Sequence, residues 1–213
     1  MSGNVPFDLS KLPPSKFGDD VWFSMFLPDE ISKLRRLLGA IGKWRQVADT
    51  EFDEFQKLCD QKRTPTWDEY GYDPAQDEVF MLLETERVMF ANLAVTIASA
   101  AENFIIGICK VRGVKYVNDS GETHFGIACQ GLGGSLKAVI SELPGYTGNQ
   151  RARMLGNCFK HSEGKTNQRF VDKYGGNLGE VIEYEKETWE QMIGDTETLL
   201  REIVSRLKTE PKT

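Results

Sequence analysis

Residues 74–111 read PAQDEVFMLLETERVMFANLAVTIASAAENFIIGICKV, the longest stretch of this chain whose apolar residues recur at a helical spacing. An apolar stripe with that period is typical of the buried face of a helix in a bundle. We therefore predict one long helix that starts at Pro74, with inward side chains at Val79, Phe80, Leu83, Val88, Phe90, Leu93, Ile97 and Phe104. Alanine and serine fill residues 91–101, so we expect a partner helix to approach closely there.

The most apolar part of this helix, residues 91–108, could also be considered as a membrane span. The run contains Glu102, and a carboxylate at the centre of a bilayer is costly. The run also barely reaches the length that crosses a bilayer. A helix buried in a bundle is the better interpretation, so we expect no membrane contact. The N-terminus shows no basic segment followed by an apolar run, which predicts a cytoplasmic protein without a signal peptide.

Helical patterns also occur on both sides of this segment. We predict further helices over residues 28–48, 50–61, 135–143, 149–161 and 178–207. Pro28, followed by two acids, suits a first helical turn, and Pro144 stops the third of these helices. The expected inward positions include Phe52 in the second helix and Val181 and Trp189 in the last.

The fold class that follows is all-α, a helical bundle with long antiparallel helices. Evidence for strands is slight, because residues 114–124 fit a small hairpin and a plain loop equally well. We divide the chain into an N-terminal arm with a helical extension (1–73), the bundle (74–207) and a frayed tail (208–213).

The composition fits a globular protein with a real core. The 213 residues are 40% hydrophobic and 27% charged, with a net charge of −6. A net-acidic chain is not a general nucleic-acid coat, so any RNA contact requires a local basic patch. Residues 151–173 contain six cations against two acids, namely Arg151, Arg153, Lys160, Lys165, Arg169 and Lys173 against Glu163 and Asp172. An ordinary solvated face gives the same pattern.

The four cysteines form no recognisable metal or disulfide pattern. Cys59, Cys109, Cys129 and Cys158 include no CxxC pair, and the chain has only two histidines. We expect reduced thiols, as in the cytosol, and no structural metal or cofactor.

The best candidate for a site is the stretch Gly156-Asn157-Cys158-Phe159-Lys160-His161-Ser162-Glu163-Gly164-Lys165. Asn157 and His161 are four residues apart, so they share one face of a helix. Histidine can move a proton near neutral pH and lysine can stabilise charge on a phosphate, which together suit cleavage of a phosphodiester. The alternative is a helix C-terminal cap, because His and Lys favour that end and Gly164 allows a left-handed turn.

This stretch, followed by Arg169-Phe170 and Lys173-Tyr174-Gly175, resembles the signature helix of the HEPN superfamily, whose pattern is Arg-Asn-x-x-x-His. Ala101-Glu102-Asn103-Phe104 resembles the family's helix that carries an acidic residue facing this motif. The resemblance implies an all-α protein that is commonly dimeric. Many members are metal-independent ribonucleases of toxin–antitoxin, abortive-infection or CRISPR-linked defence systems, and others only bind nucleic acid or nucleotides.

The resemblance also implies roles for individual residues. The implied catalytic residues are His161, Asn157, Lys160, Glu102 and Arg153. In that set the histidine is the general acid/base, the asparagine orients it or the phosphate, the cations stabilise the phosphate charge and the glutamate orients a neighbour. The candidate substrate-binding residues come from the local basic patch and are Arg151, Lys165, Arg169 and Lys173. The expected partners are RNA, a second copy of the chain, and an antitoxin or another defence-system protein.

The chain departs from the family pattern at one position. The family's arginine stands directly before the asparagine, where this chain has Gly156. Arg153, eight residues before His161, lies about 80° away from it around a helix. Either Arg153 or Arg151 substitutes, or a partner subunit supplies the cation, or the chain is a weak nuclease or a module that only binds.

Three other features could be functional or merely structural: a glycine-rich stretch, an aromatic cluster and the second histidine. Gly131–Ser135, before a predicted helix, fits a phosphate cradle or a simple turn. The aromatic residues Trp67, Tyr70 and Tyr72 fit base stacking or ordinary packing. His124 is expected on the surface.

Overall fold

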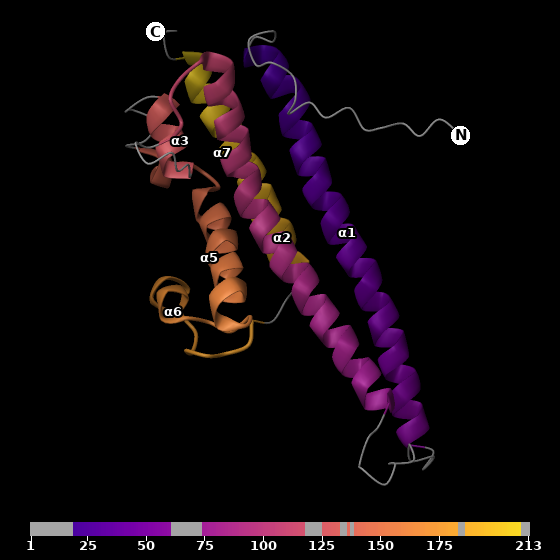
Figure 1. Cartoon of the computed structure of the whole chain (residues 1–213). Helices are drawn as coiled ribbons and strands as arrows, with labels where there is room; N and C mark the ends of the chain where they lie inside the picture. Colours follow the sequence, from indigo (N-terminus) through magenta and orange to yellow (C-terminus); the bar gives the residue numbers. More distant parts are fainter. Residues whose placement is uncertain are drawn as a thin grey trace, which may run out of the picture.

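The structure is a computed structural model that describes residues 19–60, 74–117, 125–132, 136, 139–182 and 186–209. Its elements are α1 (Asp19–Asp60), α2 (Pro74–Arg112), α3 (Phe125–Leu132), the 3-10 turn η3 (Ile140–Glu142), α5 (Tyr146–Ser162), α6 (Gln168–Tyr174) and α7 (Lys186–Thr209). Within these residues the fold is all-α, as predicted (Figure 1).

The bundle is built around α2, which contacts α1, α5 and α7 (Figure 1). Helix α1 runs antiparallel to α2, whereas α7 runs parallel to it. Two contacts fix the direction of α7: the Trp189 ring stacks on Phe90 at 5.3 Å, and Arg112 Nη2 donates to the Leu207 carbonyl at 3.0 Å. The short helix α3 also packs on α2, and α6 packs on α5.

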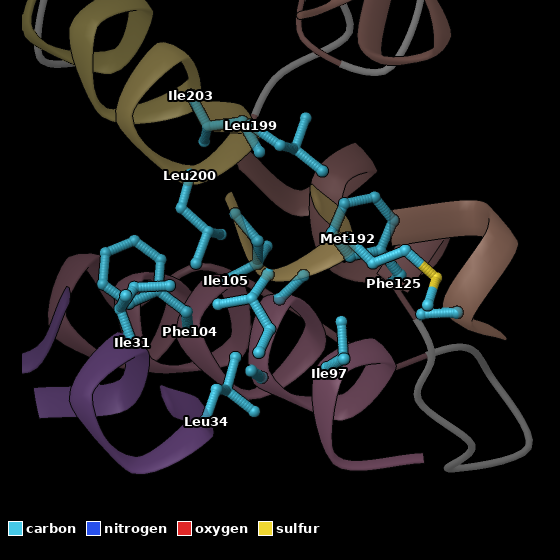
Figure 2. Packing of buried hydrophobic residues seen from close by; sticks show 14 of the residues in the cluster. Ile31, Leu34, Ile97, Phe104, Ile105, Phe125, Met192, Leu199, Leu200 and Ile203 are labelled. Atoms are coloured by element: carbon cyan, nitrogen blue, oxygen red, sulfur yellow. The ribbon is translucent and has the colours of Figure 1, made fainter. Parts of the chain in front are cut away.

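Side chains from α1, α2 and α7 meet in one core, part of which is drawn in Figure 2. Those exposed by at most 2% include Ile31, Leu34, Ile97, Phe104, Ile105, Leu199, Leu200 and Ile203. Burying one side chain of this size contributes about 1.5–3 kcal/mol, so this cluster is a main source of stability. Helix α1, which the sequence assigns to an N-terminal extension, therefore shares the core of the bundle.

Small residues let α5 lie close to two neighbours. Gly156 in α5 faces Val95 in α2, and a Cβ at this glycine would lie 3.2 Å from the valine Cγ2. Gly148, in the first turn of α5, leaves no room for a Cβ because Asp195 of α7 packs against it. The close approach expected at residues 91–101 is thus confirmed, with α5 as the partner helix.

A buried polar tie joins α2, α5 and α7. Asn149 is fully buried, and its Nδ2 donates to the Ile97 carbonyl at 3.3 Å and to the Thr196 hydroxyl at 3.2 Å. The Thr196 hydroxyl in turn donates to the Met192 carbonyl at 2.9 Å. A shift of any of these helices would leave buried polar groups unsatisfied, which is costly. The tie therefore fixes the position of α5 along the bundle.

The two helices predicted before residue 61 are a single helix, α1. Pro28 lies inside this helix rather than at its start. An interior proline costs about 3 kcal/mol, and burial of Leu27 to 4% exposure offsets part of that cost. Thr50, predicted to begin the second helix, donates its hydroxyl to the Gln46 carbonyl at 2.8 Å, a bond made within a continuous helix.

The last helix begins at Lys186, not near residue 178 as predicted. The preceding segment contains three glycines with positive φ, a conformation that interrupts a helix. The Thr166 N–H donates to the Glu180 carbonyl, and the Gly179 N–H donates to the Thr166 carbonyl, both at 2.9 Å. The segment is consequently a hydrogen-bonded turn, and Val181, predicted to face inward, is 62% exposed.

Several other apolar side chains predicted to face the core are exposed. Phe80, Leu83 and Val88 of α2 are each 56% exposed, and Phe52 of α1 is 47% exposed. The ends of α1 and α2 nearest residues 60 and 74 extend beyond the other helices (Figure 1). The apolar period identifies a helix, but it does not show how far along that helix a neighbouring helix packs against it.

Some predictions concern residues outside the described part of the chain: the arm (1–18), Trp67, Tyr70, Tyr72, His124, residues 133–135 and the end of the tail (210–213). Of the segment that fits a hairpin or a loop, residues 114–117 contain no strand. Within the described residues, one helical stretch, Phe80–Arg112, is long and apolar enough to cross a membrane, and 56% of its most apolar window is buried in the bundle.

Candidate nucleic-acid interface

Helix α5 carries most of the predicted site residues, and its end has the predicted left-handed turn. Glu163 and Gly164 have φ values of 52° and 76°. The Gly164 N–H donates to the Cys158 carbonyl at 3.3 Å, which closes the helix. Lys160 and His161 lie in the last turn, where the helix dipole favours cations.

A pocket of about 280 Å³ lies between α2 and α5. Glu102, Arg153, Asn157 and Lys160 line this α2–α5 pocket together with small residues of α2. Arg153 Nη2 lies 3.6 Å from Glu102 Oε2, and the two side chains are only 29% and 26% exposed. Partial burial strengthens an ion pair relative to one in water. The pair therefore holds the guanidinium beside Asn157.

A larger hollow of about 540 Å³, the α5–α6 groove, lies between α5 and α6. Arg153, Asn157, Arg169 and Lys173 line it, with Asp172 as the acid among them. Three cations against one acid make this groove electropositive. The groove and the α2–α5 pocket share Arg153 and Asn157, so the two hollows adjoin along α5.

The far wall of the groove, α6, was not predicted to be a helix. The Asn167 side chain accepts a hydrogen bond from the Phe170 N–H at 3.0 Å, as at a helix N-cap, and Gly175 follows the last helical residue. These two residues are the signals that the sequence offers for this helix. The helix presents Arg169 and Lys173 to the groove and buries Phe170.

Arg151 lies on a different side of α5. Its guanidinium lies 5.9 Å from the centroid of the Tyr174 ring, and both residues line a third hollow of about 370 Å³ beside Trp189. Burial raises the pKa of the Tyr174 hydroxyl, which has no hydrogen-bond partner among the described residues. Tyr174 was not predicted as a site residue, because its contact with Arg151 depends on tertiary packing.

His161 and Lys165 line none of these three hollows. His161 is exposed and follows Asn157 by one turn on the same face of α5. It therefore lies beyond the end of the α5–α6 groove rather than in its wall. Lys165 is also exposed and belongs to an isolated antiparallel bridge with Val181.

Gly156, which stands where the HEPN pattern has an arginine, lies at the contact between α5 and α2. Gly156 is buried, and its missing side chain would meet Val95 of α2. A Cβ here would require Val95 to shift by a few tenths of an ångström, and Gly156 also lines the α2–α5 pocket. Of the two arginines considered as substitutes, Arg153 lies beside Glu102, whereas Arg151 lines a different hollow.

The described residues contain no group of three or more His, Cys, Asp or Glu side chains placed to hold a metal ion. Among the described residues, Cys109, Cys129 and Cys158 are buried free thiols. Comparisons with protein-family models, with curated proteins and with solved structures find no match for this chain. Fold and site together define an all-α bundle with an electropositive groove between two of its helices.

Proposed function

We propose that this chain is a HEPN-like endoribonuclease that binds RNA in the α5–α6 groove and cuts it with His161, without a metal ion. The observation that carries the proposal is the convergence of Arg153, Arg169 and Lys173 with Asn157 on one groove, although they come from two helices. Cations grouped in this way suit the phosphates of an RNA strand. The resemblance of residues 157–165 to the HEPN signature supports the choice of RNA and of the chemistry.

In the proposed reaction the ribose 2′-hydroxyl attacks the adjacent phosphorus, and the 5′-oxygen of the next nucleotide leaves. One product ends in a 2′,3′-cyclic phosphate and the other in a 5′-hydroxyl. His161 takes the proton from the attacking hydroxyl or returns one to the leaving oxygen. Arg153 and Lys160 stabilise the charge on the phosphate, and Asn157 orients it. Glu102, 3.6 Å from Arg153, positions the guanidinium.

The resemblance also favours a bacterial toxin or defence role in the cytoplasm and a homodimer in which the motifs of two copies meet. A second copy would complete the surroundings of His161, which lies outside the three described hollows. An antitoxin or another defence-system protein would then restrain cleavage.

The test is cleavage of a labelled single-stranded RNA by the purified protein in EDTA. We expect cyclic-phosphate ends with the wild type and a loss of about 10²–10⁴-fold for His161→Ala, the usual contribution of acid–base catalysis. Lys33→Ala, a change of an exposed lysine on α1, should cut like the wild type. An all-2′-deoxy strand should bind without being cut. Cutting by the wild type no faster than by His161→Ala sinks the proposal.

A second candidate is a HEPN-like module that binds RNA without cutting it. Two observations favour it: Gly156 replaces the family's arginine, and His161 lies outside the groove. This alternative predicts RNA binding that Arg169→Ala and Lys173→Ala weaken, with no cleavage by any variant.

A further inference from the structure

Exposed apolar side chains are concentrated at one end of the described molecule. We call residues 45–60 of α1 and 74–88 of α2 the distal pair. Of the eight large apolar side chains that are strongly exposed among the described residues, six lie in this pair, namely Val47, Phe52, Phe80, Met81, Leu83 and Val88, at 47–68% exposure. Scattered apolar residues on a surface are ordinary, whereas a concentration of them marks an interaction site.

The third helix of the bundle does not reach the distal pair. Helices α1 and α2 have 42 and 39 residues, whereas α7 has 24. At about 1.5 Å per residue, α7 is roughly 25 Å shorter than its neighbours. Its first turn lies level with Phe90, on which Trp189 stacks at 5.3 Å. Leu83 precedes Phe90 by seven residues, so it lies on the same face of α2, where α7 no longer covers it.

The face of α2 that receives α5 also continues into the distal pair. Val95 is the residue that faces Gly156 of α5. Val88 and Met81 precede Val95 by seven and fourteen residues, so they continue the same line. They are 56% and 68% exposed. The end of α5 still lies beside Arg87, where a Cβ at Gly164 would be 3.4 Å from the arginine Cδ, so this second line extends beyond α5 only towards Met81.

The charge of the distal pair indicates what kind of partner fits. Its sequence contains three cations and nine acids, a net charge of −6, equal to that of the whole chain. Two of the cations are already ion-paired, Arg45 with Glu86 at 3.6 Å and Arg87 with Glu84 at 3.5 Å. The exposed acids of α1 are Asp49, Glu51, Asp53 and Glu54. A second copy would bring six more negative charges to the same place, so a cationic partner is favoured.

We infer that the distal pair is a docking site for a basic amphipathic helix of another protein. The helix lies along the line that α7 leaves open, with its apolar face on Phe52, Phe80 and Leu83. Its cations face the acids of α1. Sixteen residues span about 24 Å, which matches the length of the distal part of α1. This inference does not depend on RNA binding or cleavage.

The test uses a fluorescein-labelled 18-residue helical peptide, with Leu along one face and Lys on the others, titrated with the full-length protein. Two peptides serve as controls: one with Glu in place of every Lys, and one of the same composition with Leu spread around the helix. We expect the basic amphipathic peptide to bind at least tenfold more tightly than either control. Its affinity should fall as salt is raised, because salt screens the charges.

Matched protein variants locate the site. Phe80→Ser with Leu83→Ser should weaken binding at least tenfold, whereas Leu178→Ser with Val181→Ser, similarly exposed but outside the distal pair, should change it less than twofold. Circular dichroism checks that each pair keeps the helical fold. Equal weakening by the two pairs, or equal binding of the acidic peptide, overturns the inference. A wild-type dimer in sedimentation that Phe80→Ser with Leu83→Ser dissociates also overturns it, because the occupant is then a second copy.

Discussion

At the scale of single residues, Arg153 connects the two hollows on α5, and its surroundings leave part of its charge uncompensated. Its distance of 3.6 Å to Glu102 exceeds the roughly 2.7–2.9 Å of a charge-assisted hydrogen bond. The guanidinium also lies 5.5 Å from the centroid of the Phe125 ring, and its buried Nε has no hydrogen-bond partner among the described residues. Arg153 nevertheless lines both hollows, which is why the proposed mechanism assigns it a phosphate contact.

The buried cysteines lead to a prediction about pH. Burial raises the pKa of the Cys129 thiol to about 12 and that of Cys109 to about 11. At pH 9 only about one Cys129 thiol in a thousand is then ionised, whereas an unfolded thiol is mostly thiolate. We expect iodoacetamide at pH 9 to modify at most Cys59 in the folded protein and all four cysteines in urea, counted by intact mass. Two or more modifications of the folded protein would contradict this.

The same pKa shifts fix the sign of a stability effect. Folded thiols keep protons that unfolded thiols release above about pH 8.5. The free energy of unfolding therefore loses this contribution as pH rises from about 8.5 towards the folded values. We expect the free energy of unfolding to fall less between pH 8 and pH 10 in Cys129→Ala than in the wild type, because the variant lacks this thiol. Urea unfolding of both proteins at the two pH values measures the difference.

At the scale of elements, the contact between α5 and α7 depends on a position without a side chain. Gly148 packs against the Asp195 side chain so closely that a Cβ would overlap it. We predict that Gly148→Ala lowers the free energy of unfolding by about 1–3 kcal/mol, because overpacking outweighs the better helix propensity of alanine. Urea or thermal unfolding measures the difference.

The matched control for that change is Gly39→Ala in α1. A Cβ at Gly39 meets nothing within 4 Å, and its backbone does not have positive φ. We expect this substitution to stabilise the protein by up to about 1 kcal/mol through helix propensity alone. If both substitutions stabilise, a Cβ at position 148 fits beside Asp195 and the contact of α5 with α7 does not depend on this glycine.

The same scale shows what the sequence can and cannot predict. Helix α2 follows from its proline start and long apolar period, and the end of α5 follows from Gly164. Thr50 was misread because a hydroxyl that suits a helix start also bonds back within a helix, and only the packing of α1 on α2 decides between them. Helix α6 was missed because seven residues carry too little periodicity to identify a helix.

The candidate site was predictable to the extent that it depends on one helix. Arg153, Asn157 and Lys160 lie within about two turns of α5 on neighbouring faces, so a correct helix brings them together. Arg151 is only two residues from Arg153, but two residues turn through about 200°, which places it on another side. The pairing with Glu102 depends on how α2 and α5 align, and the sequence carries only a family resemblance for that.

At the scale of the whole molecule, neither the charge nor the burial of apolar side chains is evenly distributed. The six net negative charges of the distal pair leave the remainder of the chain neutral overall, with a cation-rich groove at α5 and α6. RNA and a basic helix would therefore be attracted to different parts of the molecule. The two proposals can be tested separately, because substitutions in the groove and in the distal pair share no residues.

Because apolar side chains are buried in one part of α1 and α2 and exposed in the other, we predict that the free energy of local opening differs along these two helices. Backbone amides open locally where few apolar contacts surround them, and amides in a buried core exchange only on global unfolding. We expect hydrogen exchange in residues 47–60 and 80–88 to be at least tenfold faster than in residues 31–41 and 93–108 of the same two helices. Mass spectrometry of peptic fragments measures the difference. Propensity alone cannot produce it, since the α2 segment 80–88 has good helix formers and residues 93–108 include several β-branched ones. Uniform protection along both helices would mean that another part of the protein or a second copy already covers the distal pair, and the docking surface would then not be free.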